Sequence, residues 1–168
     1  MNFGRGMRWV RLATDTARGY TFVELLVVTT IVLILASAVQ PLASVAIRRQ
    51  KESDLRRQLR EMRTAIDNFH DAVVTNQIPT TELKPNSEGY PPTLILLVEG
   101  VSAANDASNR KLKYLRRIPV DPFTKEAEWG FRSYQDKPDS RTWGGQNVYD
   151  VFSLSEATAL DGTKYREW

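Results

Sequence analysis

The sequence contains no cysteine and only one histidine, His70, among its 168 residues. Without cysteine the chain cannot form a disulfide framework, a thiolate metal site or a cysteine nucleophile. One histidine is too few for a zinc site built from imidazole ligands. The chain also lacks a nucleophile elbow, a Walker loop and a dinucleotide fingerprint. We therefore predict a protein that is not an enzyme and that needs no cofactor.

A positive charge excess is also missing from most of the chain. The formal net charge is +3, and the first 19 residues carry all of it, with four arginines against Asp15. Of the chain's 23 basic and 20 acidic residues, 19 of each sign then remain from Tyr20 to Trp168. Because a nucleic-acid-binding domain normally carries a basic stripe, we expect no nucleic-acid partner.

A long apolar segment follows the basic N-terminus. Tyr20 to Val39 would form about 30 Å of α-helix, which matches the hydrocarbon core of a bilayer. Glu24 is the only charged residue in this segment. A charge inside a membrane costs about 2.5–3.5 kcal/mol on insertion scales, so it normally has a function and a partner. The segment predicts a membrane helix in which Glu24 has a specific role.

The residues at the start of this segment resemble the processing and assembly signal of type IV prepilins. They are an arginine-rich leader, Gly19, the aromatic Tyr20 and the carboxylate Glu24. The resemblance implies that a prepilin peptidase cleaves after Gly19 and N-methylates Tyr20, which makes Glu24 the fifth residue of the mature chain. It also implies that Glu24 pairs with the Tyr20 amine of a neighbouring subunit in a filament. Most relatives have phenylalanine at the position of Tyr20, so this chain keeps the aromatic ring.

Two other interpretations of the N-terminus remain open. Ala36-Ser37-Ala38 fits the cleavage site of a secretory signal peptide, which would release a soluble periplasmic binding protein. A plain single-pass membrane anchor would leave Glu24 unexplained. The apolar region of a signal peptide is usually about 7–15 residues long and has no carboxylate, which favours the prepilin interpretation.

Basic residues lie on both sides of the apolar segment. Three leader arginines favour a cytoplasmic leader, although three basic residues at 48–51 nearly balance them.

Pro41 would be the twenty-second residue of the mature chain, where type IV pilins often have proline. It predicts a kink, local melting or the end of the span. We expect a cleaved leader at 1–19 and a transmembrane and polymerisation helix at 20–41. The region that follows is expected in the periplasm, anchored to the inner membrane.

After Pro41 the sequence pattern becomes amphipathic. Apolar residues recur at spacings of three and four, as in a helix that covers a small domain. They are Leu55, Leu59, Met62, Ile66, Phe69 and Val73. The opposite face carries mainly arginines, which we expect to be solvated. This continuation of the helix is predicted over 42–76, before Pro79.

The region 77–168 predicts short elements separated by loops. An apolar run at 93–98 indicates a brief helix, and 101–110 is small and polar, as in a loop. Strand character appears at 128–134, 147–153 and 163–168. We predict an α+β pilin fold, in which a long N-terminal helix, membrane-spanning in its first half, packs against a small three-stranded antiparallel sheet.

Several C-terminal stretches, in the same order, resemble the major pseudopilin of type II secretion systems. They are Tyr90-Pro91, Tyr114–Pro119 with Asp121-Pro122-Phe123, and Tyr149–Ser153. The resemblance implies a structural subunit of a helical homopolymer that helps protein export across the outer membrane. Its implied partners are minor pseudopilins, an inner-membrane assembly platform and the prepilin peptidase. A type IV pilus or DNA-uptake pilin is the alternative.

The same resemblance implies a calcium site after the strand that ends near Ser153. Asp161 and Glu156 are the closest acidic matches to its ligands, and calcium takes about six to eight oxygen ligands. Asp161, however, lies farther from Ser153 than is usual, and the acid-rich tail of the family is missing. A turn at Asp161-Gly162 is the competing interpretation.

Overall fold

The structure is a computed structural model that describes residues 19–104 and 110–168, apart from the side chains at 38–42 and 82. The expected leader at 1–19 therefore lies outside the described residues, except for Gly19. The chain divides into two compact units, one that ends at Ala43 and one formed by Ser44–Trp168. Helix α1 contributes to both units.

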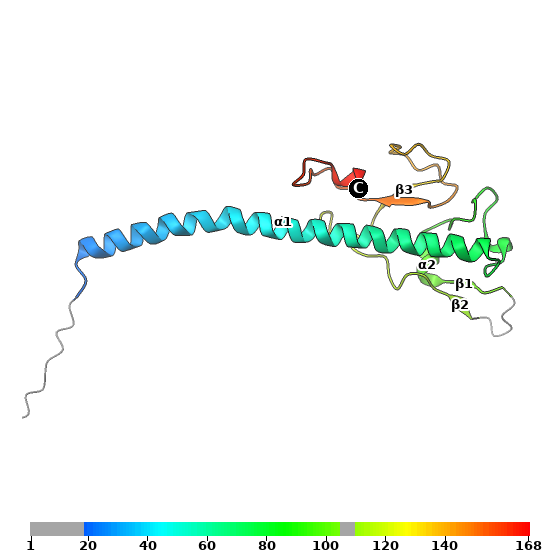
Figure 1. Cartoon of the computed structure of the whole chain (residues 1–168), viewed down its shortest axis with the longest axis horizontal. Coiled ribbons are helices and arrows are strands. Elements are labelled where there is room, and N and C mark those ends of the chain that lie inside the picture. The colour runs from blue at the N-terminus through cyan, green and yellow to red at the C-terminus, as the bar shows by residue number, and fades with distance from the viewer. Residues whose placement is uncertain (1–18, 105–109) are drawn as a thin grey trace, which may run out of the picture. The chain divides into compact units, whose positions relative to one another are not determined.

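Helix α1, Phe22–Val74, is 53 residues long and confirms the long N-terminal helix (Figure 1). Its end is set by Asn76, which has a left-handed φ of 55°. The Asn76 N–H donates to the carbonyl of Val73 at 3.0 Å. Asparagine tolerates this conformation, which commonly closes helices. The helix therefore ends at Val74, slightly before the predicted position.

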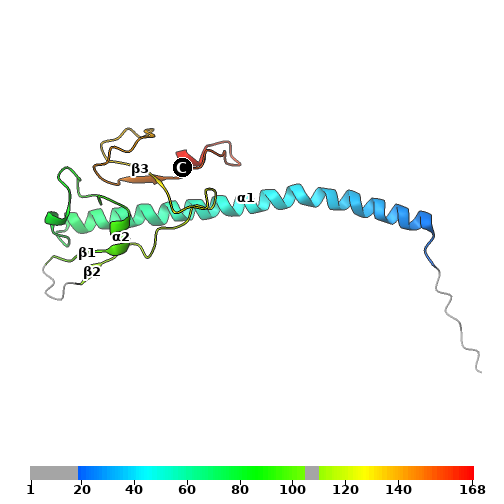
Figure 2. The same cartoon turned by 180° about the vertical axis from the view of Figure 1, so that it is seen from behind.

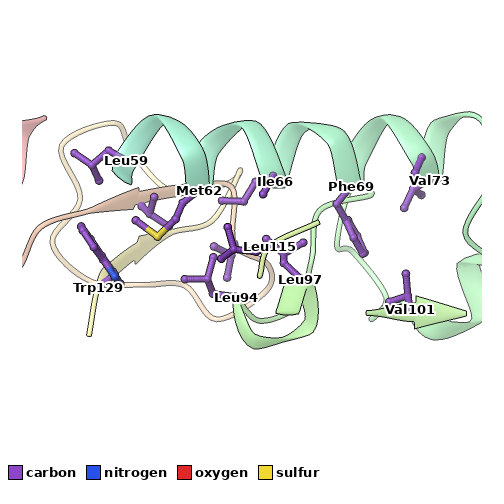
Figure 3. Close-up of a cluster of buried hydrophobic side chains, with 14 of the residues drawn as sticks. Leu59, Met62, Ile66, Phe69, Val73, Leu94, Leu97, Val101, Leu115 and Trp129 are labelled. Atoms are coloured by element: carbon purple, nitrogen blue, oxygen red, sulfur yellow. The ribbon is translucent and has the colours of Figure 1, made fainter. Parts of the chain in front are cut away.

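The part of α1 in the Ser44–Trp168 unit buries the predicted apolar stripe. All six residues of the stripe are at most 8% exposed. They pack with a second set of buried residues that includes Leu94, Leu97, Val101, Leu115 and Trp129 (Figure 3). Helix α2, Ile95–Glu99, supplies Leu97 and confirms the brief helix expected at 93–98. Each buried side chain of this size contributes about 1.5–3 kcal/mol, so the stripe is the main anchor of the unit.

The described residues form two separate two-stranded antiparallel sheets, and the single three-stranded sheet that the sequence predicted is wrong. Strand β1, Val101–Ser102, pairs with β2, Lys111–Leu112. Strand β3, Gly130–Arg132, pairs with β4, Asp150–Phe152. The β1–β2 pair and β3 are seen on either side of α1 (Figures 1 and 2). Strand β1 was expected to be a loop because its small polar sequence carries no alternation.

The expected third strand at 163–168 is instead a 3-10 turn, η2, Tyr165–Glu167. Within the part of the chain that the structure describes, one isolated antiparallel bridge, Thr158 to Lys164, involves this segment. Tyr165 and Trp168 contact each other edge to face with ring centroids 5.1 Å apart. Residues three apart point to opposite faces of a strand but to the same side of a 3-10 turn. The aromatic contact therefore requires the turn. A similar short turn, η1, Thr80–Glu82, follows α1.

A buried carboxylate joins the loop after Pro119 to β4. Asp121 and Ser153 are both fully buried. The Ser153 hydroxyl donates to Asp121 Oδ2 at 2.5 Å, and the Phe123 N–H donates to Asp121 Oδ1 at 2.7 Å. A buried carboxylate without donors would be strongly destabilising. Two of the sequence stretches that resemble major pseudopilins therefore meet at this contact.

Candidate assembly site

Gly19 and Tyr20 precede α1, and Tyr20 is 76% exposed. A Cβ atom added at Gly19 would meet no atom within 4 Å, and the backbone there is not left-handed. Neither the fold nor the backbone conformation therefore requires glycine at position 19. A side chain at position 19 would therefore be compatible with the described part of the fold.

Thr21 caps the N-terminus of α1 and was missed by the sequence analysis. Its Oγ1 accepts a hydrogen bond from the Glu24 backbone N–H at 3.2 Å. Glu24 lies in the first turn, where a carboxylate favours the positive end of the helix dipole. Threonine followed three residues later by glutamate is the pattern of a capping box, so the signal was present in the sequence. The cap fixes where the helix starts and therefore where the Glu24 carboxylate lies.

The first part of α1 exposes its apolar side chains on all sides. The residues are Phe22, Val23, Leu25, Leu26, Val27, Val28, Ile31, Val32, Leu33, Ile34 and Leu35, each 49–80% exposed. We call this set, together with Glu24, the assembly surface. A contiguous apolar surface of this kind marks a site that a protein or a lipid covers.

The hydroxyl groups within this part of α1 are satisfied by the helix itself. Thr29 donates to the carbonyl of Leu25 at 2.9 Å, and Thr30 donates to that of Leu26 at 2.7 Å. Ser37 donates in the same way to Ile34 at 2.7 Å. The Glu24 carboxylate, in contrast, makes no hydrogen bond or ion pair with any described residue. The assembly surface thus offers hydrocarbon and one unpaired carboxylate.

Pro41 lies within α1, and its side chain is outside the described residues. Across the described side chains, no helix is both long and apolar enough to cross a membrane.

The N-terminal residues match a known family. Residues 15–39 correspond to the family described as the prokaryotic N-terminal methylation motif. The chain carries a type IV pilin-like prepilin signal. The match includes Gly19, Tyr20 and Glu24 and ends before Pro41. No curated protein and no solved structure was found to match the chain. The prepilin signal indicates a type IV pilin-like subunit.

The residues that the resemblance suggested as calcium ligands contact other groups of the chain. Asp161 Oδ1 accepts from the Thr163 N–H and hydroxyl at 2.9 and 2.6 Å, and Asp161 Oδ2 faces Arg56 at 3.3 Å. These contacts lower the pKa of Asp161 below its usual value, and the hydrogen bond from the Thr163 hydroxyl contributes most. Glu156 pairs with Arg166 at 2.6 Å, and the Ser153 hydroxyl is bound to Asp121. Asp161-Gly162 forms the predicted turn, with Gly162 at a φ of 89°.

Arginines on α1 bind residues of the segment 154–168. We had expected the arginines on α1 opposite the apolar stripe to be solvated. Arg48 donates to the carbonyl of Thr158 and to the Tyr165 hydroxyl. Arg56 lies 4.1 Å over the Trp168 ring. Arg63 donates to Asp150 Oδ1 at 2.7 Å and to the carbonyl of Trp168 at 2.8 Å. We call Arg48, Arg56 and Arg63 the arginine clamp. Cationic side chains thus bind the carbonyls and carboxylates of this segment.

Proposed function

We propose that the chain is a structural subunit of a type II secretion pseudopilus. A prepilin peptidase removes residues 1–19 and methylates the amine of Tyr20. The mature chain resides in the inner membrane through α1, with the Ser44–Trp168 unit in the periplasm. Subunits then polymerise, together with minor pseudopilins and an inner-membrane assembly platform, into a periplasmic filament that helps export proteins across the outer membrane.

The observation that carries this proposal is the assembly surface with its unpaired Glu24. In a bundle of apolar helices, a carboxylate without a partner is strongly destabilising. Cleavage after Gly19 creates a cationic amine at Tyr20, four residues before Glu24. A pair between Glu24 of one copy and the Tyr20 amine of the next therefore satisfies both groups. Because other axial positions would leave the charges unpaired, the pair sets the register between subunits.

Two features favour a secretion pseudopilus over a type IV pilus or DNA-uptake pilin. The stretches that resemble major pseudopilins include the Asp121 and Ser153 positions that meet in the core. The chain also has no cysteine, whereas many type IV pilins close their C-terminal loop with a disulfide. A soluble binding protein would require cleavage after Ala38, in the middle of α1.

Deletion of the gene in the source bacterium tests the proposal. We expect proteins that normally reach the medium to accumulate in the periplasm, while surface pili and DNA uptake remain normal. Complementation by the full chain should restore export. Loss of pili or DNA uptake with normal export would instead support the type IV pilin alternative.

A further inference from the structure

Three tyrosines, two exposed and one half-buried, form a cluster in the Ser44–Trp168 unit. The rings of Tyr90, Tyr134 and Tyr149 contact one another, with centroids 5.1–5.8 Å apart. Tyr134 and Tyr149 are 56% and 43% exposed, and Tyr90 stacks on His70 of α1 at 4.4 Å. None of the three hydroxyls makes a hydrogen bond within 19–104 and 110–168. We call Tyr90, Tyr134 and Tyr149 the tyrosine surface.

Two carboxylates of α1 make this surface acidic. Burial raises the pKa of Tyr90, and the nearby Tyr149, Asp67 and Asp71 add to the rise. Both aspartates are exposed, and the Asp71 carboxylate lies 4.0 Å from Nδ1 of His70. Aromatic faces beside carboxylates fit a cationic side chain, and arginine fits best because its planar guanidinium stacks on rings.

A hollow of about 540 Å³ with a positive lining lies elsewhere on the same unit. Its lining residues are Arg57, Gln58, Glu61, Arg116, Arg117 and Pro119; we call it the basic hollow. Arg57 pairs with Asp54, but Arg116 and Arg117 are exposed and have no ion pair among the described residues. Gln58 Oε1 is buried there without a hydrogen-bond partner in the described part of the chain. Within the described part of a single copy, the basic hollow therefore has a carbonyl oxygen without a donor and two arginines without an ion-pair partner.

The two surfaces adjoin opposite edges of the buried stripe on α1. At about 100° per residue, Gln58 lies about 40° to one side of Met62, and His70 lies about 80° to the other side. Gln58 lines the basic hollow, and His70 contacts the tyrosine surface. One copy therefore presents the two surfaces in different directions, as a head-to-tail contact requires. Contacts of this type form open filaments rather than closed dimers.

We propose that the basic hollow of one copy binds the tyrosine surface of the next copy in the filament. Arg116 and Arg117 stack on the exposed rings, while Asp67 and Asp71 balance their charge. The proposal rests on the proposed function because it requires copies to lie side by side. Since residues 20–168 contain equal numbers of basic and acidic residues, net charge does not oppose the contact.

Site-directed crosslinking tests this contact, since the natural chain has no cysteine. Two differently tagged full-length chains are co-expressed, one with Glu61→Cys in the basic hollow and one with Gln135→Cys beside Tyr134. Both substitutions leave the proposed arginines and tyrosines in place. A short thiol crosslinker should join the two tags in assembled filaments. Ala157→Cys, exposed in the segment 154–168, replaces Gln135→Cys in the matched control and should give a much weaker product.

The outcomes separate this inference from the proposed function. Filaments seen by electron microscopy without the Glu61–Gln135 product would overturn the inference and leave the function standing. A product from two Gln135→Cys copies alone would also overturn it, because that contact is symmetric. Absence of filaments in wild-type cells that export normally would contradict the proposed function itself.

Substitution of the tyrosines gives a second measurement. Tyr134→Ala with Tyr149→Ala should lower filament yield by about tenfold or more, as expected for aromatic residues central to an interface. Tyr134→Phe with Tyr149→Phe keeps the rings and should lose less. Near-ultraviolet circular dichroism checks that each variant is folded. Wild-type filament yield from the folded alanine variant would contradict the proposal.

Discussion

At the start of α1, Thr21 and Glu24 differ in what they offer a neighbouring subunit. The Thr21 Oγ1 is used within the chain, because it accepts from the Glu24 N–H. The Glu24 carboxylate has no partner among the described residues. Capping and assembly therefore depend on different atoms, and substitutions can separate them.

We predict that Glu24→Ala gives a processed and stable membrane-resident chain that does not form filaments, because the neighbouring amine loses its partner. Glu24→Gln should be intermediate, since it keeps hydrogen-bond acceptors without the charge. Thr21→Ala is the matched control: it should cost about 0.5–2 kcal/mol of helix stability and reduce assembly much less. Electron microscopy and crosslinking of overproduced subunits measure the yield. Normal filaments from Glu24→Ala would show that this carboxylate does not set the register.

The arginine clamp acts at the scale of the secondary-structure elements, because it fastens 154–168 and β4 to α1. Arg63→Ala should lower the free energy of unfolding by about 1–2 kcal/mol, since three hydrogen bonds to Asp150, Val151 and Trp168 are lost from a partly exposed side chain. Arg57→Ala is the matched control. It should change stability by less than about 0.5 kcal/mol, because its pair with Asp54 is exposed.

Chemical unfolding of the full chain in detergent, followed by circular dichroism, measures both variants. Equal destabilisation by Arg63→Ala and Arg57→Ala would show that the clamp contributes nothing beyond an ordinary surface pair.

The elements differ in how far their sequence determines them. The buried stripe of α1 was predictable because its period is set by local geometry. The turn at 165–167 was not, because the contact of Tyr165 with Trp168 and the stack of Tyr165 on Phe123 depend on tertiary packing. The arginine clamp could not be predicted from the sequence either. Arg57 and Arg63 occupy equivalent places in an amphipathic pattern, and only the fold brings hydrogen-bond acceptors to Arg63.

The N-terminal residues of the candidate site could be predicted from the sequence, whereas the tyrosine surface could not. Gly19, Tyr20 and Glu24 stand out because a glycine, an aromatic ring and a lone carboxylate precede or enter an apolar run. The tyrosine surface brings together residues from three distant segments, so no local pattern could reveal it.

At the scale of the whole molecule, the proposed assembly depends on processing of the N-terminus and on two surfaces that we propose bind each other. Processing comes first, because the Tyr20 amine that pairs with Glu24 exists only after cleavage. Every later step of the proposed assembly depends on that cut.

Mass spectrometry of the N-terminal peptide of the mature protein, purified from membranes, is therefore the most direct test. We predict a chain that begins at Tyr20 with one added methyl group on its amine. Gly19→Val should leave the uncleaved precursor in the membrane, because the fold has room for a side chain at position 19 but the peptidase requires a minimal one. A mature chain that begins at Val39, or normal processing of the Gly19→Val variant, would contradict the account.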